Sequence, residues 1–223
     1  MSDDASSPQK QTGADYLRQI LRAPVYEAAI VTPLQDMPRL SARIGNLVQL
    51  KREDRQPVHS FKLRGAYNMV SSLNEQQKAA GVIAASAGNH AQGVAIAAAG
   101  NKLKATIFMP RSTPIVKQDA VREFGREFVE IRLVGDSFDE SSEQANEFAA
   151  ASGGVLIPPY DDLYVIAGQS TIGVEMLSDL VQKPTHAFLP IGGGGMAAGV
   201  ASVLKRLSPE TKLIGVEAVD QNS

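Results

Sequence analysis

The chain has 223 residues, of which 43% are hydrophobic, so it can bury a sizeable core in one large domain or two smaller ones. Its net charge of -2 argues against nucleic acid as a main partner, and the absence of cysteine excludes disulfides and thiolate metal sites. The polar start lacks an apolar signal-peptide core, and no apolar run is long enough to span a bilayer, so we expect a cytoplasmic protein without a membrane partner.

The first part of the chain predicts little regular structure. Residues 1–14 offer almost nothing to bury and are expected to be disordered. A helix is expected from about 14 to 21, where apolar residues fall on one face. Residues 31–34 should be extended or turn, and residues 46–51 should form a strand before the polar loop 52–59.

Beyond this loop and the helix that follows it, apolar strands alternate with longer helices. The expected strands cover residues 81–86, 105–110, 128–133, 155–158, 186–191 and 213–219. The expected helices between them cover residues 89–99, 114–124, 137–151, 164–180 and 196–207. This alternation predicts an α/β protein with doubly wound parallel sheets. Because a parallel strand needs a neighbour on each edge, the end just after the last strand predicts the front part of a longer protein.

The sequence places Lys62 where a positive charge is electrostatically unfavourable. Ser60 is a good N-cap residue and apolar residues follow at helical spacing, so Lys62 is expected in the first turn of a helix. The aligned peptide dipoles place partial positive charge at this end, which disfavours a cation. Lys62 is therefore either well solvated or held as a neutral amine, the form that makes imines. On the local sequence alone, the solvated interpretation comes first.

Two later strand-to-helix turns are rich in small residues. In open α/β sheets, ligands bind beyond the carboxyl ends of the strands, where such turns point N–H groups outward. The turn Ser86-Ala87-Gly88-Asn89-His90 is either a tight turn with a capping asparagine or a pocket for an anionic group. The run Gly192-Gly193-Gly194-Gly195 costs conformational entropy, which is justified if the backbone must wrap a ligand closely. Phosphate is the obvious candidate, held by successive N–H groups and the helix dipole.

The same glycine run permits a dinucleotide interpretation. Gly192, Gly194 and Ala197 fit the dinucleotide fingerprint, and Glu217 ends the last strand, where a ribose-binding acid would lie. The alternative prediction is therefore an NAD-dependent oxidoreductase, although it leaves the helix-start lysine and the asparagine turn without a role. No metal site is expected, because the three histidines lack ligand spacing.

A lysine at a helix start, a phosphate-binding glycine run and a polar turn together suit a pyridoxal phosphate enzyme, and here the resemblance is specific. The segment Ser60-Phe61-Lys62-Leu63-Arg64-Gly65-Ala66 resembles the cofactor-lysine motif of the serine/threonine dehydratases. Residues 86–93 resemble their substrate loop, and residues 192–195 resemble their phosphate loop. The similarity runs from about Tyr16 to the end, and the leading segment is most similar to the biosynthetic threonine dehydratases.

The resemblance implies a fold, a reaction and a role for each residue. The fold would be the pyridoxal phosphate fold type II, like the tryptophan synthase beta subunit. The reaction would be the β-elimination of L-threonine to 2-oxobutanoate and ammonia, the first step towards isoleucine, with serine as the other small amino acid to consider. Lys62 would carry pyridoxal 5'-phosphate as a Schiff base and remove the substrate's α-proton. The other implied cofactor-binding residues are Phe61, Asn89, Gly192, Gly193, Gly194, Gly195 and Met196, and the residues implied at the substrate carboxylate are Ser86, Ala87, Gly88 and His90.

The chain also departs from the family pattern. Ala87 stands where the related racemases carry a second serine, which argues against racemisation. The segment Gly168-Gln169-Ser170-Thr171 differs from the usual Gly-Gln-Gly-Thr, so its packing needs explanation.

The resemblance implies two domains, of which the larger is incomplete. The small α/β domain would cover residues 59–160, and the larger cofactor-binding domain residues 15–58 and 161–223. The family's partner for the pyridine nitrogen and its regulatory domain lie beyond residue 223. We therefore expect a homo-oligomer for the full-length protein and weak activity for this chain, with an inactive fragment as a further alternative.

Overall fold

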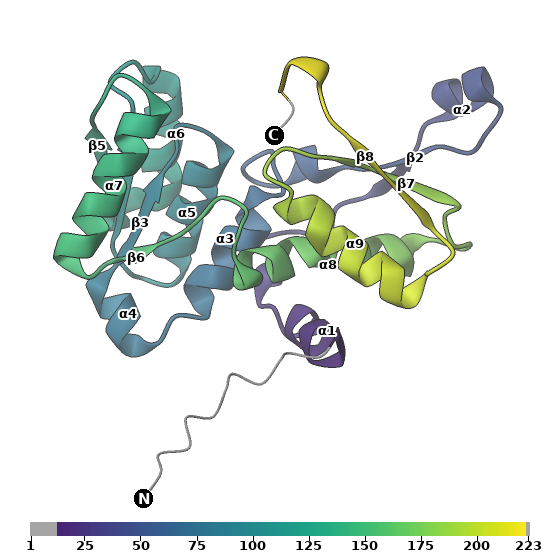
Figure 1. The fold of residues 1–223 in the computed structure, drawn as a ribbon, viewed down its shortest axis with the longest axis horizontal. Coiled ribbons are helices and arrows are strands. Elements are labelled where there is room, and N and C mark those ends of the chain that lie inside the picture. Colours follow the sequence, from purple (N-terminus) through teal and green to yellow (C-terminus); the bar gives the residue numbers. More distant parts are fainter. Residues whose placement is uncertain (1–12, 222–223) are drawn as a thin grey trace, which may run out of the picture.

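The computed structural model describes residues 13–221, which form two groups of helices and strands around a central helix (Figure 1). The helices are α1 (Gly13–Leu21), α2 (Pro38–Ile44), α3 (Lys62–Ser71), α4 (Glu75–Ala80), α5 (Asn89–Gly100), α6 (Ile115–Gly125), α7 (Phe138–Ser152), α8 (Leu163–Asp179) and α9 (Gly195–Leu207). The strands are β1 (Leu34–Asp36), β2 (Gln49–Lys51), β3 (Val82–Ala85), β4 (Ala105–Met109), β5 (Val129–Leu133), β6 (Val155–Leu156), β7 (His186–Pro190) and β8 (Lys212–Val216). The alternating strands and helices expected from residue 81 onwards are thus confirmed to within a few residues.

The expectation of disorder over residues 1–14 falls mostly outside the described residues. Its last two positions belong to α1, which begins at Gly13. No helix within residues 13–221 is long and apolar enough to cross a membrane.

The first group is built on a parallel sheet with strand order β5-β4-β3-β6 (Figure 1). Val82 and Ala84 point to a core shared with α3, α5 and α6. Ile83 and Phe108 point to the opposite face, where they pack against Ala145 of α7. Both faces of this sheet are therefore covered by helices, as parallel sheets require.

The second group contains the parallel pair β7–β8, with α8 and α9 packed on one face (Figure 1). Ala187 and Leu189 of β7 are buried against Ile172 and Val200, which come from α8 and α9. Phe188, which points the other way, is 65% exposed.

The strands β1 and β2 pair antiparallel, a pairing that the sequence did not predict. The sequence predicted a strand over 46–51 but left β1 as an extended or turning segment. It also gave no helix at α2 or α4, although Pro38 begins α2 and a left-handed Gly45 ends it.

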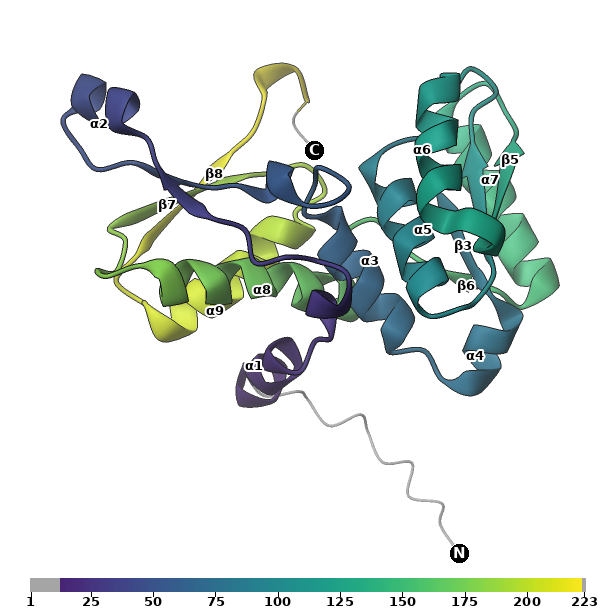
Figure 2. The ribbon, with the colours of Figure 1, turned by 180° about the vertical axis from the view of Figure 1, so that it is seen from behind.

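Helix α3 lies between the two groups, as Figures 1 and 2 both show. Glycine makes its close contact with α8 possible: a Cβ at Gly168 would lie only 2.5 Å from the carbonyl oxygen of Arg64. The unusual Ser170 fits because it faces Gly199, where an added Cβ would lie 2.9 Å from the Ser170 hydroxyl. The hydroxyl of Ser170 itself donates to Ile166 O at 2.8 Å.

A buried ionic network ties α3 to α8 and to the N-terminal segment. The Arg64 side chain is fully buried and donates to Glu53 at 2.8 Å and to Glu175 at 2.6 Å. Lys51 Nζ lies 2.8 Å from the same Glu175 carboxylate, and the Tyr26 hydroxyl donates to it at 2.8 Å. Because Arg64 lies two residues after Lys62, this network holds the helix that presents the lysine.

Candidate active site

The N-cap of α3 is Phe61 rather than the expected Ser60, but the first helical residue is Lys62, so the expected place of Lys62 in the first turn is confirmed. Its backbone N–H donates to the Ser60 hydroxyl at 3.2 Å. Its side-chain amine donates to Pro159 O at 2.6 Å and lies 5.6 Å and 5.9 Å from the ring centres of Phe61 and Tyr160. Burial lowers the pKa of the Lys62 amine, and the positive end of the helix dipole acts in the same direction. The Lys62 amine is therefore easier to deprotonate than the amine of a fully solvated lysine.

The turn at the end of β3 leads directly into α5. The Ser86 hydroxyl accepts a hydrogen bond from Gly88 N at 3.2 Å, which closes the turn. Asn89 is the first helical residue; Gly88 occupies the N-cap position, and there is no side-chain cap. The exposed Asn89 amide is therefore available to a ligand rather than used as a cap. Gly93 lets α5 approach α3, since a Cβ there would lie 3.2 Å from Lys62 O.

His90 lies next to Asn89 but points into the protein. Its side chain is 5% exposed, and Nε2 lies 2.8 Å from Ile157 O. Burial lowers the pKa of His90 to about 4, although the hydrogen bond to Ile157 acts the other way. The ring nitrogen Nε2 thus faces the backbone, and the expected place of His90 at the substrate carboxylate stays a prediction.

The glycine run joins β7 to α9. Gly194 has a φ of +78° and is the N-cap of α9, so the chain turns here through a left-handed conformation that favours glycine. The first N–H groups of a helix have no acceptor inside it, which leaves those of Gly195, Met196 and Ala197 for another partner. Tyr160 lies directly against the run: a Cβ at Gly193 would collide with its ring, and one at Gly195 with its backbone oxygen.

One short segment, residues 157–160, thus contacts all three parts of the site. Ile157 O accepts from His90, Pro159 O accepts from Lys62, and Tyr160 packs against the glycines. The residues fit pyridoxal phosphate: a partly buried amine of lowered pKa lies near a run of backbone in which Gly193 and Gly195 leave no room for a Cβ beside Tyr160. The sequence did not predict a role for this segment, because it contributes backbone carbonyls and every residue has one.

We expect the substitution Gly195→Ala to weaken pyridoxal phosphate binding by roughly ten-fold or more, because the new methyl would push the run away from Tyr160. The free energy of unfolding should fall by about 1–3 kcal/mol. Gly192→Ala is the matched stability control, since a Cβ there meets no protein atom within 4 Å. Denaturant unfolding and a fluorescence titration with pyridoxal phosphate measure both effects; unchanged values for Gly195→Ala would contradict the tight contact.

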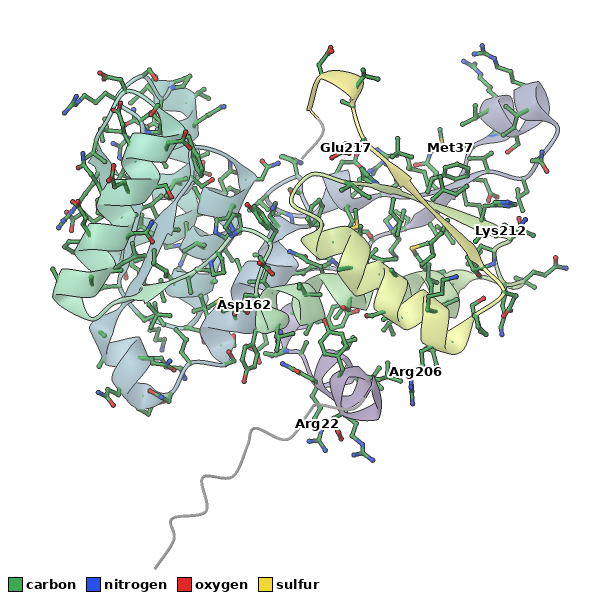
Figure 3. The ribbon with its side chains drawn as sticks, in the orientation of Figure 1. Arg22, Met37, Asp162, Arg206, Lys212 and Glu217 are labelled. Carbon is green, nitrogen blue, oxygen red and sulfur yellow. The ribbon has the colours of Figure 1, made fainter. Side chains whose placement is uncertain are left out.

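The structure also places Glu217, the acid of the dinucleotide interpretation, and Asp162, which has no part in that interpretation (Figure 3). Figure 3 shows Glu217 beyond the end of β8, where its side chain is exposed, and Asp162 at the start of α8. Asp162 is a helix cap that accepts from Tyr164 N at 2.7 Å and Val165 N at 3.1 Å. Among residues 13–221, no cluster of three or more histidine and carboxylate side chains could hold a metal ion.

Comparisons with known proteins all point to one family. Residues 25–223 match the family described as pyridoxal-phosphate dependent enzyme. The biosynthetic L-threonine dehydratase of Pasteurella multocida is 56% identical over 209 residues, which cover 94% of this chain and 40% of that protein. The corresponding protein of Escherichia coli is 53% identical over 223 residues, which cover 99% of this chain and 42% of that protein. The chain thus spans about 40% of the length of these curated relatives.

Solved structures agree with the fold. The processed form of threonine deaminase isoform 2 from Solanum lycopersicum superposes with a TM-score of 0.90 at 48% identity, covering 93% of this chain and 59% of that one. Maize serine racemase superposes with a TM-score of 0.85 at 30% identity, covering 93% of this chain and 62% of that one. The expected fold type II architecture is thereby confirmed.

Proposed function

This chain belongs to the family of pyridoxal-phosphate dependent enzymes, and from that premise we propose that it carries the lysine and phosphate half of a threonine dehydratase site. The proposed reaction converts L-threonine to 2-oxobutanoate and ammonia. The names of the relatives, which are biosynthetic L-threonine dehydratases, support the choice of substrate and a biosynthetic role.

The observation that carries the proposal is the environment of the Lys62 amine. It is buried enough for its pKa to fall, it is held at 2.6 Å by Pro159 O, and it shares Tyr160 with the glycine run. A neutral amine is what attachment to a carbonyl compound needs, and free backbone N–H groups are what a phosphate needs. The dinucleotide interpretation uses only the second of these features.

Each expected residue has a proposed task. Lys62 Nζ would hold the cofactor covalently and would later accept the α-proton of the amino acid. The N–H groups of residues 192–196 would bind the phosphate, and Phe61 and Asn89 would orient the cofactor ring. Residues 86–88 and His90 would bind the substrate carboxylate through the turn and the start of α5. When bound, pyridoxal phosphate supplies an electron sink for the charge that develops on the α-carbon.

The division into domains is part of the proposal. We propose a small domain over residues 59–160, with residues 15–58 and 161–223 in the larger one. The four-stranded sheet lies wholly within the first range, and β7–β8 lies within the second. We also propose a cytoplasmic location, a homo-oligomer for the full-length protein, and threonine as the substrate, with serine as the other amino acid to test.

The experiment that tests the proposal is covalent trapping. The protein is incubated with pyridoxal phosphate, reduced with borohydride and digested, and the labelled peptide is mapped. We expect the label on Lys62, because its amine is neutral at a lower pH than that of an exposed lysine. Binding of NAD with no label on any lysine would support the oxidoreductase alternative instead. A parallel assay for 2-oxobutanoate with threonine and with serine separates an active chain from an inactive one and ranks the two substrates.

A further inference from the structure

The Lys62 amine is held by a backbone carbonyl rather than by a side chain. Its acceptor, Pro159 O, belongs to the segment 157–160 that follows β6. A carbonyl in a connecting segment stays in place only if the segment itself is fixed. What fixes residues 157–160 therefore decides where Lys62 Nζ lies.

His90 provides one of these fixed points. Its Nε2 lies 2.8 Å from Ile157 O, two residues before Pro159, and the imidazole is buried. A carbonyl oxygen only accepts, so Nε2 must carry the proton and donate it. Ile157 N in turn donates to Ile83 O at 2.8 Å, so this residue is held by β3 through its N–H and by α5 through its carbonyl.

The charge state of His90 suits its role in fixing the segment 157–160. His90 of α5 interacts electrostatically with the Lys62 amine, and the ring centre of Tyr160, from the segment 157–160, lies 5.9 Å from it. Lys62 and His90 would repel each other if both were charged, and burial keeps the pKa of His90 at about 4. At neutral pH the imidazole is therefore an uncharged donor that can hold Ile157 O without opposing a charge on Lys62.

We propose that His90 is a positioning residue for Lys62: through Ile157 O it fixes the segment 157–160, whose Pro159 carbonyl holds the reactive amine. The inference rests on the proposed cofactor-bearing role of Lys62. It assigns the His90 side chain a task other than lining the substrate carboxylate pocket. It also links the start of α5 to the lysine at the start of α3 through two hydrogen bonds.

The test uses the rate at which pyridoxal phosphate and borohydride label Lys62, measured against pH. His90→Leu removes the donor, so water should reach the loosened segment and solvate Lys62. We expect labelling of Lys62 at neutral pH to slow by roughly ten-fold, the size of effect of a lost buried hydrogen bond. The pH midpoint of labelling should move upward, because a better solvated lysine has a higher pKa. His90→Gln should restore most of the rate, since its amide can donate to Ile157 O.

A matched control separates positioning from loss of stability. Gln118 is also buried in the small domain, and its amide donates to a backbone oxygen, Thr113 O, at 2.9 Å. Gln118→Leu should destabilise the chain in a comparable way but leave the rate and pH midpoint of Lys62 labelling unchanged. Circular dichroism and denaturant unfolding check that each variant is folded. If His90→Leu does not fold, His90→Asn, whose amide is too short to reach Ile157 O, takes its place.

Three results would overturn the inference. Labelling of the donor-less variant within about two-fold of the wild type, with the same pH midpoint, would show that His90 does not position Lys62. Equal slowing in His90→Gln and His90→Leu would assign the effect to the shape of the ring rather than to its N–H donor. A wild-type chain that takes no label on Lys62 at any pH would remove the proposed function and this inference together.

Discussion

Replacing Lys62 with alanine is expected to abolish covalent attachment of pyridoxal phosphate and to lower threonine dehydration by at least about 10²–10⁴-fold, the usual contribution of a general base. Both effects follow from one atom, because Nζ is the proposed point of attachment and the proposed acceptor of the α-proton. Borohydride trapping measures the first effect, and release of 2-oxobutanoate measures the second. The fold should persist, since the Lys62 side chain is outside the buried ionic network.

Lys117→Ala is the control for this substitution. Lys117 lies on α6 and is exposed, so its loss should change neither the label nor the rate. The pH dependence adds a further check. Burial lowers the pKa of Lys62, so at neutral pH a limiting amount of reagent should mark Lys62 before the exposed lysines. A Lys62→Ala protein that still formed 2-oxobutanoate at the wild-type rate would contradict the assignment.

The part of the fold that the sequence predicted is the part with local signals. Strands β3 and β4 are short, largely apolar runs, and Ser137 is the N-cap of α7, where its hydroxyl accepts from Glu140 N at 3.2 Å. The missed helices had signals as well. Asn74 and Gln77 form a capping box at the start of α4, with the Asn74 side chain accepting from Gln77 N at 2.8 Å. The antiparallel pairing of β1 and β2 had none, because strands of three residues show no clear periodicity.

The candidate site also contains residues that the sequence predicted and residues that it did not. Lys62, Asn89 and the glycine run were predicted because each is a residue type with a chemical task at a helix start. The carbonyls of Ile157 and Pro159 were not, since every residue has one and only the fold selects which of them face a side chain. The task of His90 was unpredictable for the same reason, as its partner lies 67 residues further along the chain.

Arg64 is the other residue that the sequence left without a role. It stands within the lysine motif, but its partners Glu53 and Glu175 come from separate parts of the chain. Burial by itself lowers the pKa of Arg64, yet the hydrogen bonds and charges of the two carboxylates outweigh it and raise the pKa. The guanidinium therefore stays charged and depends on both carboxylates for compensation.

We expect Glu175→Ala to lower the free energy of unfolding by about 3–5 kcal/mol, the cost of removing one partner from a buried ion pair. The Glu175 carboxylate accepts from Arg64, Lys51, the Tyr26 hydroxyl and the backbone N–H of Thr32. Its removal leaves the fully buried Arg64 with Glu53 as its remaining carboxylate partner. Denaturant unfolding at neutral pH measures the loss. Asp119→Ala, which breaks an exposed pair with Arg122, should cost less than about 1 kcal/mol under the same conditions.

The pH dependence of the same network gives the more specific result. Burial raises the pKa of Glu175, but the hydrogen bonds and charges of Arg64 and Lys51 outweigh it, and the pKa lies below its usual value of 4.5. A carboxylate with a lowered pKa in the folded state contributes stability above the unfolded pKa, and this contribution is lost as the pH falls through the folded one. The difference in unfolding free energy between the wild type and Glu175→Gln should therefore be largest above about pH 4.5 and shrink in more acidic solution. A difference that stayed constant from pH 7 down to strongly acidic pH would mean that the Glu175 charge does not hold Arg64, and that α3 owes its position beside α8 to glycine packing alone.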